Sequence, residues 1–169
     1  MDRLWERHIL NCAVVTEAVP RGTQVLDIGA GAGLPGLVWA LARPDLTVIC
    51  LEPLLRRATF LTETVATLGL TDRVEVIRGR AEDLARTGEL QAPVTTARAV
   101  APLERLAGWA LPLTSSGGEL LALKGSSAEA EVTAAAAAIT AAGGDEVSIE
   151  EFGSGIVDPP TRVVRIRKS

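Results

Sequence analysis

Several residue types are scarce in this chain of 169 residues, and each scarcity excludes a class of protein. Tyrosine is absent, histidine occurs once, and the two cysteines, Cys12 and Cys50, lie in apolar stretches. Such cysteines favour reduced core residues over a disulfide framework or a metal site. No apolar run reaches the roughly 18 residues of a transmembrane helix, and the charged start, MDRLWERHIL, lacks the apolar stretch of a signal peptide. We therefore expect a cytoplasmic protein with no metal site and no membrane association.

Lysine is also rare, since Lys124 and Lys168 are the only two and arginine supplies the remaining positive charge. The net charge is −4 and the isoelectric point is about 5.1. These values argue against a non-specific nucleic-acid-binding protein with a broad basic face, although a local basic patch is compatible with them. Hydrophobic residues make up 47% of the chain and charged residues 22%, which is typical of a folded protein. The length suits a single domain over residues 1–169.

The sequence contains a regular alternation of strand and helix patterns. An amphipathic helix is expected at the N-terminus, over residues 2–19. Apolar strands are expected over residues 25–28, 47–52, 73–79, 94–100 and 119–124. Helices are expected over residues 34–44, 53–69, 102–113 and, in an alanine-rich stretch, 128–144. This alternation predicts a doubly wound parallel α/β sheet.

The C-terminal segment, DEVSIEEFGSGIVDPPTRVVRIRKS, departs from this alternation. It contains two strand patterns with no room for a crossover helix between them, so these strands must be antiparallel neighbours. A dinucleotide-binding Rossmann sheet is normally parallel throughout. A sheet that ends in an antiparallel hairpin is the usual arrangement of methyltransferases that use S-adenosylmethionine (SAM). The expected fold class is therefore α/β, a Rossmann-like class I SAM-dependent methyltransferase with a seven-stranded, mostly parallel sheet.

The stretch VLDIGAGAGLPG, residues 25–36, runs from a buried strand through a glycine-rich turn into a helix. Glycines let backbone N–H groups approach a ligand closely at the positive end of a helix, and the methionine carboxylate of SAM suits that position. From Gly31 onward the turn also matches the dinucleotide fingerprint. Three features favour SAM: Asp27 at the strand end, Gly29 directly after the strand, and the C-terminal hairpin.

Two further groups of residues are placed to bind an adenosine. Glu52 ends the second strand, where a carboxylate can accept hydrogen bonds from both ribose hydroxyls of SAM or of NAD. The segment RAED, residues 80–83, follows the third strand, where Glu82 or Asp83 could accept from the adenine amine. The backbone of Ala81 and Glu82 could meet the ring edge. Acidic residues in the first turn of a helix explain this segment equally well.

The methyl acceptor is narrowed mainly by motifs that the chain lacks. The segment after the fourth strand, ARAVAPLE, is not the Asp/Asn-Pro-Pro-aromatic motif of exocyclic-amine methyltransferases, and the DPP of residues 158–160 lies in the terminal loop. Neither cysteine lies on a loop that would supply the nucleophile for cytosine methylation, and His8 is the only histidine that could act as a base. Guanine N7 fits these absences because it has a lone pair and no proton to lose, so that alignment alone could drive its methylation. Other methyl acceptors that need little help from a general base are also compatible with these missing motifs.

Five motifs follow one another along the chain: RHILN, LDIGAGAGLPG, RAED, ARAVAPL and LALKG. With these motifs the chain, from about residue 3 to its end, resembles the RsmG (GidB) family of small-subunit ribosomal RNA methyltransferases. The resemblance implies SAM-dependent methylation of N7 of one guanine in 16S rRNA, position 527 in conventional rRNA numbering. It implies 16S rRNA or the 30S subunit as the partner, and we expect the enzyme to be a monomer.

The resemblance also implies which residues form the site. Arg98 would be the catalytic residue between SAM and the RNA, holding a phosphate or the guanine edge, although a surface salt bridge also explains an arginine at a strand end. Lys124 would contact a phosphate or a base, although simple solvent exposure explains it too. His8 shares a helical stripe with Cys12, which also suits a partly buried histidine that caps the core. The residues expected to bind SAM are Gly29, Gly31, Gly33, Leu34, Glu52, Ala81, Glu82 and Arg98, and those expected to bind the RNA are Lys124, Arg7, His8 and Arg57.

Other functions are compatible with the residues alone. The family usually has a longer helical segment before RHIL, and an acid and a serine where this chain has Asn11 and Cys12. The low isoelectric point and the scarce aromatic residues suit a SAM-dependent methyltransferase of a small molecule or a protein. A non-catalytic SAM-binding module and an NAD-dependent oxidoreductase are the further alternatives, and the terminal hairpin argues against the last.

Overall fold

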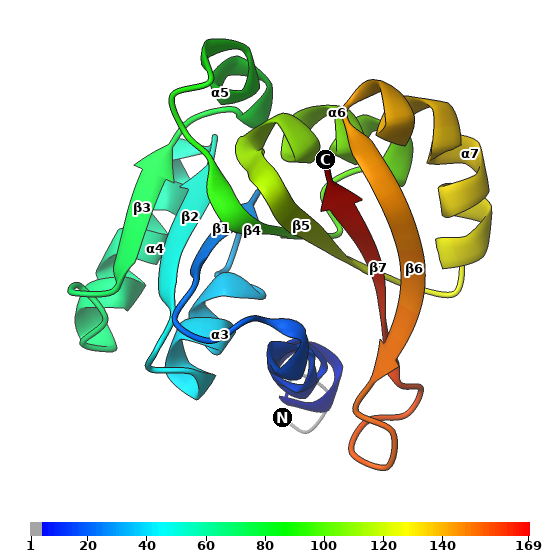
Figure 1. The fold of residues 1–169 in the computed structure, drawn as a ribbon. Coiled ribbons are helices and arrows are strands. Elements are labelled where there is room, and N and C mark those ends of the chain that lie inside the picture. The colour runs from blue at the N-terminus through cyan, green and yellow to red at the C-terminus, as the bar shows by residue number, and fades with distance from the viewer. Residues whose placement is uncertain (1–4) are drawn as a thin grey trace.

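A twisted seven-stranded sheet forms the centre of the computed structural model, which describes residues 5–169 (Figure 1). The strand order is β3-β2-β1-β4-β5-β7-β6. The first five strands in this order are parallel, and β7 pairs antiparallel with both β5 and β6. The predicted fold class is confirmed, including the C-terminal hairpin. The strands are β1 (Gln24–Ile28), β2 (Thr47–Glu52), β3 (Val74–Arg78), β4 (Ala92–Arg98), β5 (Thr114–Lys124), β6 (Gly144–Phe152) and β7 (Thr161–Lys168).

Helices cover both faces of the sheet, and a helical segment precedes it. The N-terminal helical segment consists of η1 (Trp5–Leu10), α2 (Asn11–Ala13) and η2 (Val14–Ala18). The other helices are α3 (Gly36–Ala42), α4 (Leu55–Thr67), α5 (Ala81–Thr87), α6 (Leu103–Leu113) and α7 (Ala128–Ala141). Within residues 5–169, none of these helices combines the length and the apolar character that crossing a membrane requires.

The helix boundaries differ in places from the sequence prediction. The helix predicted over residues 2–19 starts outside the described residues and ends at Ala18, and its first turns have π geometry. The helix predicted over residues 34–44 covers only α3, because Pro35 precedes it as its N-cap and the backbone of Arg43 is extended. The acidic RAED segment begins a helix, α5. Its acidic residues therefore lie in the first turn of a helix, which was the alternative explanation of the segment.

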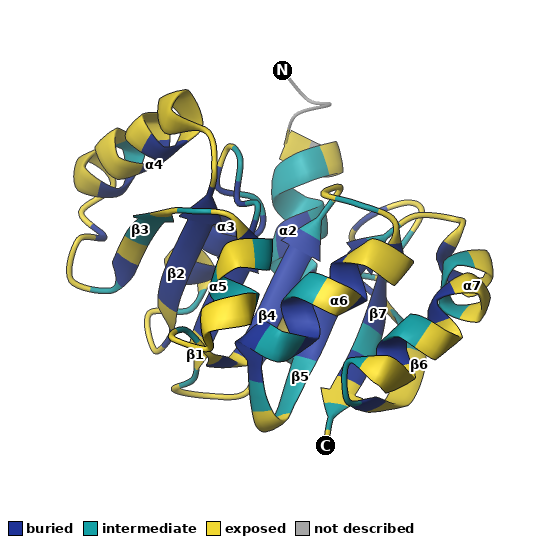
Figure 2. Ribbon diagram, turned by 90° about the horizontal axis from the view of Figure 1, so that it is seen from above, coloured by how far each residue is buried: buried dark blue, intermediate teal, exposed yellow. Residues whose placement is uncertain are grey.

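Each face of the sheet contributes to a separate hydrophobic core, because strand side chains alternate between the two faces. In β1, Val25 packs into a core with the N-terminal helical segment, α3 and α4, and Leu26 packs into the opposite core with α5, α6 and α7. Both residues are fully buried, and Figure 2 shows the central strands buried beneath these helices. With both faces covered, polar groups can meet a ligand only at the strand ends.

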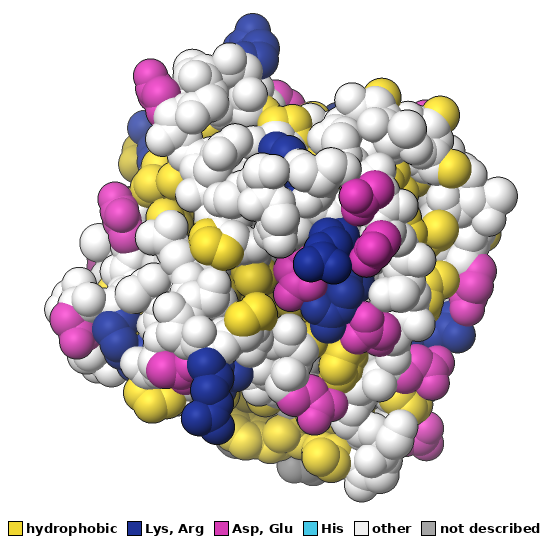
Figure 3. Space-filling view, viewed as in Figure 1, with side chains coloured by type: hydrophobic (Ala, Val, Ile, Leu, Met, Phe, Trp, Pro, Cys, Tyr) yellow, Lys and Arg dark blue, Asp and Glu magenta, His cyan; other side chains and the backbone are white. Residues whose placement is uncertain are grey.

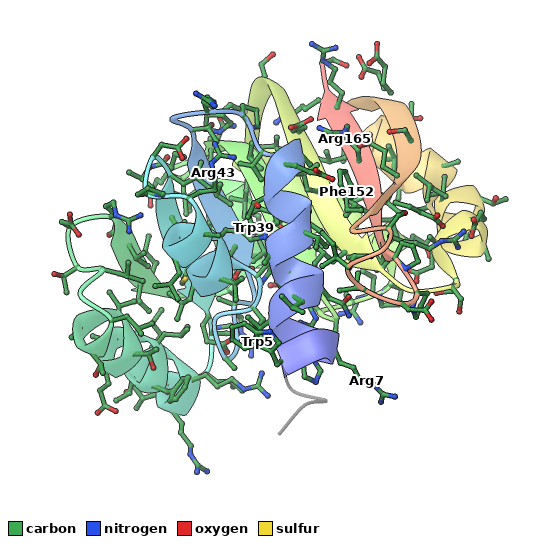
Figure 4. All side chains as sticks on the ribbon, turned by 90° about the horizontal axis from the view of Figure 1, so that it is seen from below. Trp5, Arg7, Trp39, Arg43, Phe152 and Arg165 are labelled. Atoms are coloured by element: carbon green, nitrogen blue, oxygen red, sulfur yellow. The ribbon has the colours of Figure 1, made fainter. Side chains whose placement is uncertain are left out.

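The N-terminal helical segment is fastened to the rest of the protein at three points. The indole Nε1–H of the fully buried Trp39 donates to the Cys12 carbonyl oxygen at 2.8 Å (Figure 4). Arg43 donates to the Thr16 carbonyl oxygen at 2.9 Å, near the C-terminal end of the segment. The Thr161 hydroxyl, at the start of β7, donates to the Asn11 carbonyl oxygen at 3.1 Å. These bonds direct the start of the segment toward the carboxyl ends of the parallel strands.

We predict that Trp39→Phe lowers the free energy of unfolding by about 2–4 kcal/mol, because it removes the buried indole hydrogen bond to the Cys12 carbonyl and leaves a small void. Urea denaturation monitored by circular dichroism measures the change. The matched control is Trp109→Phe, since Trp109 is only partly buried and its indole ring stacks under Arg105 at 5.0 Å. Equal losses in the two variants would contradict the role assigned to the Trp39 hydrogen bond.

Candidate functional site

Two cavities open side by side at the carboxyl ends of the parallel strands, the edge where α/β sheets bind ligands. One, of about 630 Å³, is lined by the glycine-rich turn and by Glu52, and we call it the glycine cavity. The other, of about 1080 Å³, is lined by Lys124 and by the loop before β7, and we call it the lysine cavity. Arg98, Ala99 and Val100 line both cavities. We call residues 98–101, the end of β4 and the start of the loop after it, the shared wall.

The loop between β1 and α3 adopts a shape that depends on its glycines. Gly29 and Gly31 have φ values of +68° and +56°, which side chains rarely tolerate. A β-carbon on Gly29 would also lie 2.8 Å from Val100 Cγ2, too close for any side chain. Glycine at position 29 thus lets the turn and the shared wall approach each other over the glycine cavity.

Glu52 is held in place inside the glycine cavity. Only 1% of the residue is exposed, yet it lines the cavity. Its Oε2 accepts from the Gly31 N–H and its Oε1 from the Leu54 N–H, both at 3.0 Å. Each oxygen keeps a second lone-pair site, so the carboxylate can still accept hydrogen bonds from a pair of ligand hydroxyls. The glycine pattern predicted that the N–H groups of this turn would face a ligand. The Gly31 N–H instead donates to Glu52 and orients its carboxylate.

Asp27 lies fully buried beneath the glycine-rich turn. Its Oδ2 accepts from the Gly36 N–H at 2.8 Å, which ties β1 to the first turn of α3. Its Oδ1 has no hydrogen-bond partner. Burial raises the pKa of Asp27 to about 7, and the neighbouring Glu52 carboxylate adds to the rise, against the opposing effect of the Gly36 N–H. The carboxyl group therefore changes charge near neutral pH, directly under the turn.

Arg98 is held by uncharged acceptors on the N-terminal helical segment. Its Nη1 donates to the His8 carbonyl oxygen at 3.3 Å and to the Cys12 Sγ at 3.2 Å, and its Nη2 contacts the His8 Nδ1. Among the residues that the structure describes, no carboxylate forms an ion pair with it. The alternative of a surface salt bridge is therefore wrong. A positive charge without a counter-ion faces both cavities.

Lys124 anchors the shared wall from the side of the lysine cavity. Its Nζ donates to the Ala101 carbonyl oxygen and pairs with Glu131 Oε2, both at 2.8 Å. Its side chain is 9% exposed, so solvent exposure does not explain this lysine. The wall itself is bent, because Ala99 has φ of +53° and is the one non-glycine residue in the described chain with a positive value. Lys124 thus holds the backbone at Ala101, two residues after the strained Ala99.

Glu131, on α7, is the site residue that sequence reasoning missed. One carboxylate accepts from Lys124, from the Leu103 N–H at 2.9 Å and from the Ser127 hydroxyl at 2.9 Å. Burial opposes the charge of Glu131, but the three donors outweigh it and hold the pKa of Glu131 below its usual value. The one available clue was an acid in the first turn of the alanine-rich helix.

The structure brings together most, but not all, of the predicted site residues. Arg7 lies exposed at the edge of the lysine cavity, and Figure 4 shows its side chain pointing away from the helical segment. Gly33 is buried behind the turn, and Ala81 and Glu82 begin α5; none of these three lines either cavity. The predicted residues that do share the glycine cavity are His8, Gly29, Gly31, Leu34, Glu52, Arg57 and Arg98.

The charges away from the cavities are mixed. On the face shown in Figure 3, Lys and Arg side chains are interspersed with Asp and Glu. Among the pairs on β5, β6 and β7, Arg165 bonds both Glu119 and Glu150. This face shows no continuous basic area.

Comparisons with known proteins agree with this geometry. The family model described as GidB, rRNA small subunit methyltransferase G, matches residues 1–158. The protein named Ribosomal RNA small subunit methyltransferase G from Salinispora tropica is 54% identical over 170 residues, which cover 98% of this chain and 70% of that protein. Its namesake from Streptomyces coelicolor is 56% identical over 167 residues, with coverages of 98% and 69%.

A solved structure shows the same fold at low sequence identity. The mitomycin 7-O-methyltransferase MmcR superposes with a TM-score of 0.74 at 19% identity, over 95% of this chain. The present chain spans 54% of the length of that protein. At this identity the likeness supports the methyltransferase fold and nothing finer.

We predict that the stability of the protein reflects the buried Asp27. Between the ordinary Asp pKa of 3.8 and about 7, the folded state keeps a proton that the unfolded chain releases. The Asp27 contribution to the free energy of unfolding therefore falls as the pH rises through this range. Asp27→Asn, which is neutral throughout, should gain stability relative to the unmodified protein between pH 4 and about 7.5. Urea denaturation at several pH values measures the difference, and a difference independent of pH would contradict the assignment.

We predict that Glu131→Ala lowers the free energy of unfolding by about 1–3 kcal/mol, because it leaves the Lys124 ammonium and the Leu103 N–H without their acceptor. The matched control is Glu129→Ala, two positions earlier on the same helix, where the carboxylate pairs with Arg162 near the surface. That exposed pair should contribute little. Urea denaturation compares the two variants, and a similar loss in both would show that the Lys124–Glu131 pair has no special role.

Proposed function

Because this chain belongs to the rRNA small subunit methyltransferase G family, it is a SAM-dependent rRNA methyltransferase, and we propose that it methylates N7 of one guanine in 16S rRNA, position 527 in conventional rRNA numbering. The choice of N7 rests on one observation: the side chains that could act as a general base in the two cavities already have partners. Each carboxylate that lines them is already hydrogen-bonded: Glu52 to two backbone N–H groups, Glu131 to Lys124, and Glu151 to Arg162. His8 Nδ1 contacts Arg98. An acceptor atom that has no proton to lose suits such a site.

The glycine cavity fits SAM. Glu52 is placed to accept hydrogen bonds from the ribose hydroxyls, and Gly29 lets the turn and Val100 close together over the cavity. Leu34 and Gly31 would line the methionine portion of SAM, and the start of α5 at Ala81 and Glu82 would lie toward adenine. When bound, SAM supplies a methyl group on a positively charged sulfur.

The lysine cavity is placed to receive the target guanine. It is separated from the glycine cavity only by the shared wall, which contains Arg98. No carboxylate of the described residues pairs with Arg98, so we propose that its guanidinium contacts an RNA phosphate or the guanine edge. Catalysis would then consist of holding N7 in line with the methyl group, since alignment alone can supply roughly 7–11 kcal/mol of a barrier.

The RNA contacts we propose are confined to the rim of the two cavities. Arg7 and Arg57 are exposed and flank them, while the face in Figure 3 carries charges of both signs. Two of the three ammonium protons of Lys124 are directed to Ala101 and Glu131, so Lys124 would contact the RNA only through the third. We further propose that residues 1–169 form one domain that acts as a monomer on 16S rRNA or the 30S subunit.

The test is transfer of a labelled SAM methyl group to naked 16S rRNA and, separately, to 30S subunits from cells that lack this gene. Strand cleavage specific for N7-methylguanine maps the product. We expect one labelled guanine. Arg98→Ala should lower the rate about 10- to 100-fold, the effect of losing one hydrogen bond from a charged group.

The matched control is Arg86→Ala, because Arg86 is an exposed arginine on α5 that pairs with Asp83 outside both cavities. Label on neither RNA, with SAM binding intact, would overturn the choice of acceptor. Label on an RNA atom other than N7 would retain the enzyme class and overturn the choice of atom.

A further inference from the structure

The only histidine of the chain contacts the guanidinium that separates the two cavities. His8 lies on the N-terminal helical segment and lines the glycine cavity, and it is partly buried. Its Nδ1 meets Arg98 Nη2 across a separation of 90 residues in the sequence. The His8 carbonyl oxygen and the Cys12 Sγ complete the set of acceptors around Arg98. The side chain of His8 is thus one of three groups that orient Arg98.

This contact requires one particular protonation state of the imidazole. A guanidinium keeps its protons in proteins and can only donate hydrogen bonds. Nδ1 must therefore carry a lone pair, which places the imidazole proton on Nε2. Protonation of His8 would turn Nδ1 into a donor and bring two cations into contact, and histidine is the side chain that changes charge most readily near neutral pH.

Among the side chains that the structure describes, no carboxylate forms an ion pair with His8. The titratable groups that face it are Cys12 on its own segment, Arg98 at the end of β4, and Glu52 and Arg57 across the glycine cavity. Burial raises the pKa of the Cys12 thiol, so this group is uncharged. Glu52 is bonded to Gly31 and Leu54.

We propose that His8 is a positioning residue: its imidazole Nδ1 fixes Arg98 in the shared wall beside the glycine cavity, and SAM binding weakens when this acceptor is lost. The proposal rests on the proposed function only in assigning the glycine cavity to SAM. The carbonyl contact from His8 persists in any variant, so removal of the imidazole should weaken the site without abolishing it.

The tautomer of His8 is the direct test. Because the chain has one histidine, a two-dimensional ¹⁵N–¹H spectrum of untagged protein labelled at histidine shows a single imidazole ring. We expect a neutral ring protonated at Nε2 at pH 7.5. A ring protonated at Nδ1, or a charged ring at that pH, would overturn the proposal.

The functional test compares SAM affinity in three proteins at pH 7.5 by isothermal titration calorimetry. His8→Ala should bind SAM about tenfold more weakly than the unmodified protein, the effect of one hydrogen bond of about 1.4 kcal/mol. His8→Asn, whose Oδ1 replaces the Nδ1 acceptor, should keep the affinity of the unmodified protein.

A merely structural role of His8 is the competing explanation. If His8→Asn loses as much SAM affinity as His8→Ala, the acceptor at this position has no special role and the proposal is overturned. Unchanged affinity in His8→Ala would overturn it too. These measurements need no RNA, so they stand even if the acceptor assigned above fails. Circular dichroism verifies that every variant is folded.

Discussion

The burial of both faces of the sheet is the constraint on which the rest of the structure depends. Val25 and Leu26 are neighbours in β1, yet they belong to different cores on opposite faces. A strand enclosed in this way leaves no room for unpaired polar groups except at its end. Asp27 and Glu52, both almost completely buried, lie at or near such ends and are fixed by backbone N–H groups. The same constraint that forms the core therefore produces a rigid set of carboxylates under the glycine-rich turn.

The second level of organisation is the wall between the two cavities. Val100 packs against Gly29 and Ala99 takes a backbone conformation that non-glycine residues rarely adopt. Such a segment persists only when its surroundings determine it. Here Arg98 is held from the N-terminal helical segment, and Ala101 is held by Lys124 and indirectly by Glu131. Bonds from the N-terminal helical segment, β5 and α7 thus converge on four consecutive residues, 98–101.

The sequence was informative where the physics is local. Strand periodicity, the glycine-rich turn and the helix-free terminal segment predicted the sheet, its antiparallel hairpin and the position of Glu52. The resemblance named Arg98, which lines both cavities. The pairing of Lys124 with Glu131 could not be predicted, because Lys124 ends a strand, Glu131 lies on the helix that follows it, and only the fold brings their side chains together. Alanines surround Glu131 on nearly all sides of α7, so no apolar stripe indicated which face would turn inward. The contact between His8 and Arg98 was likewise invisible, because it joins residues 90 positions apart.

The bond between Thr161 and Asn11 has a consequence for the time at which the site is complete. The two residues are 150 positions apart, and Asn11 lies in the same helical segment as His8 and Cys12, which hold Arg98. While the chain is being synthesised, the glycine-rich turn and β4 leave the ribosome well before β7 does. The segment that orients Arg98 gains its last fastening only when the C-terminal strand has been released and inserted between β5 and β6. A nascent chain can therefore form the glycine-rich turn before the segment that orients Arg98 has all of its fastenings.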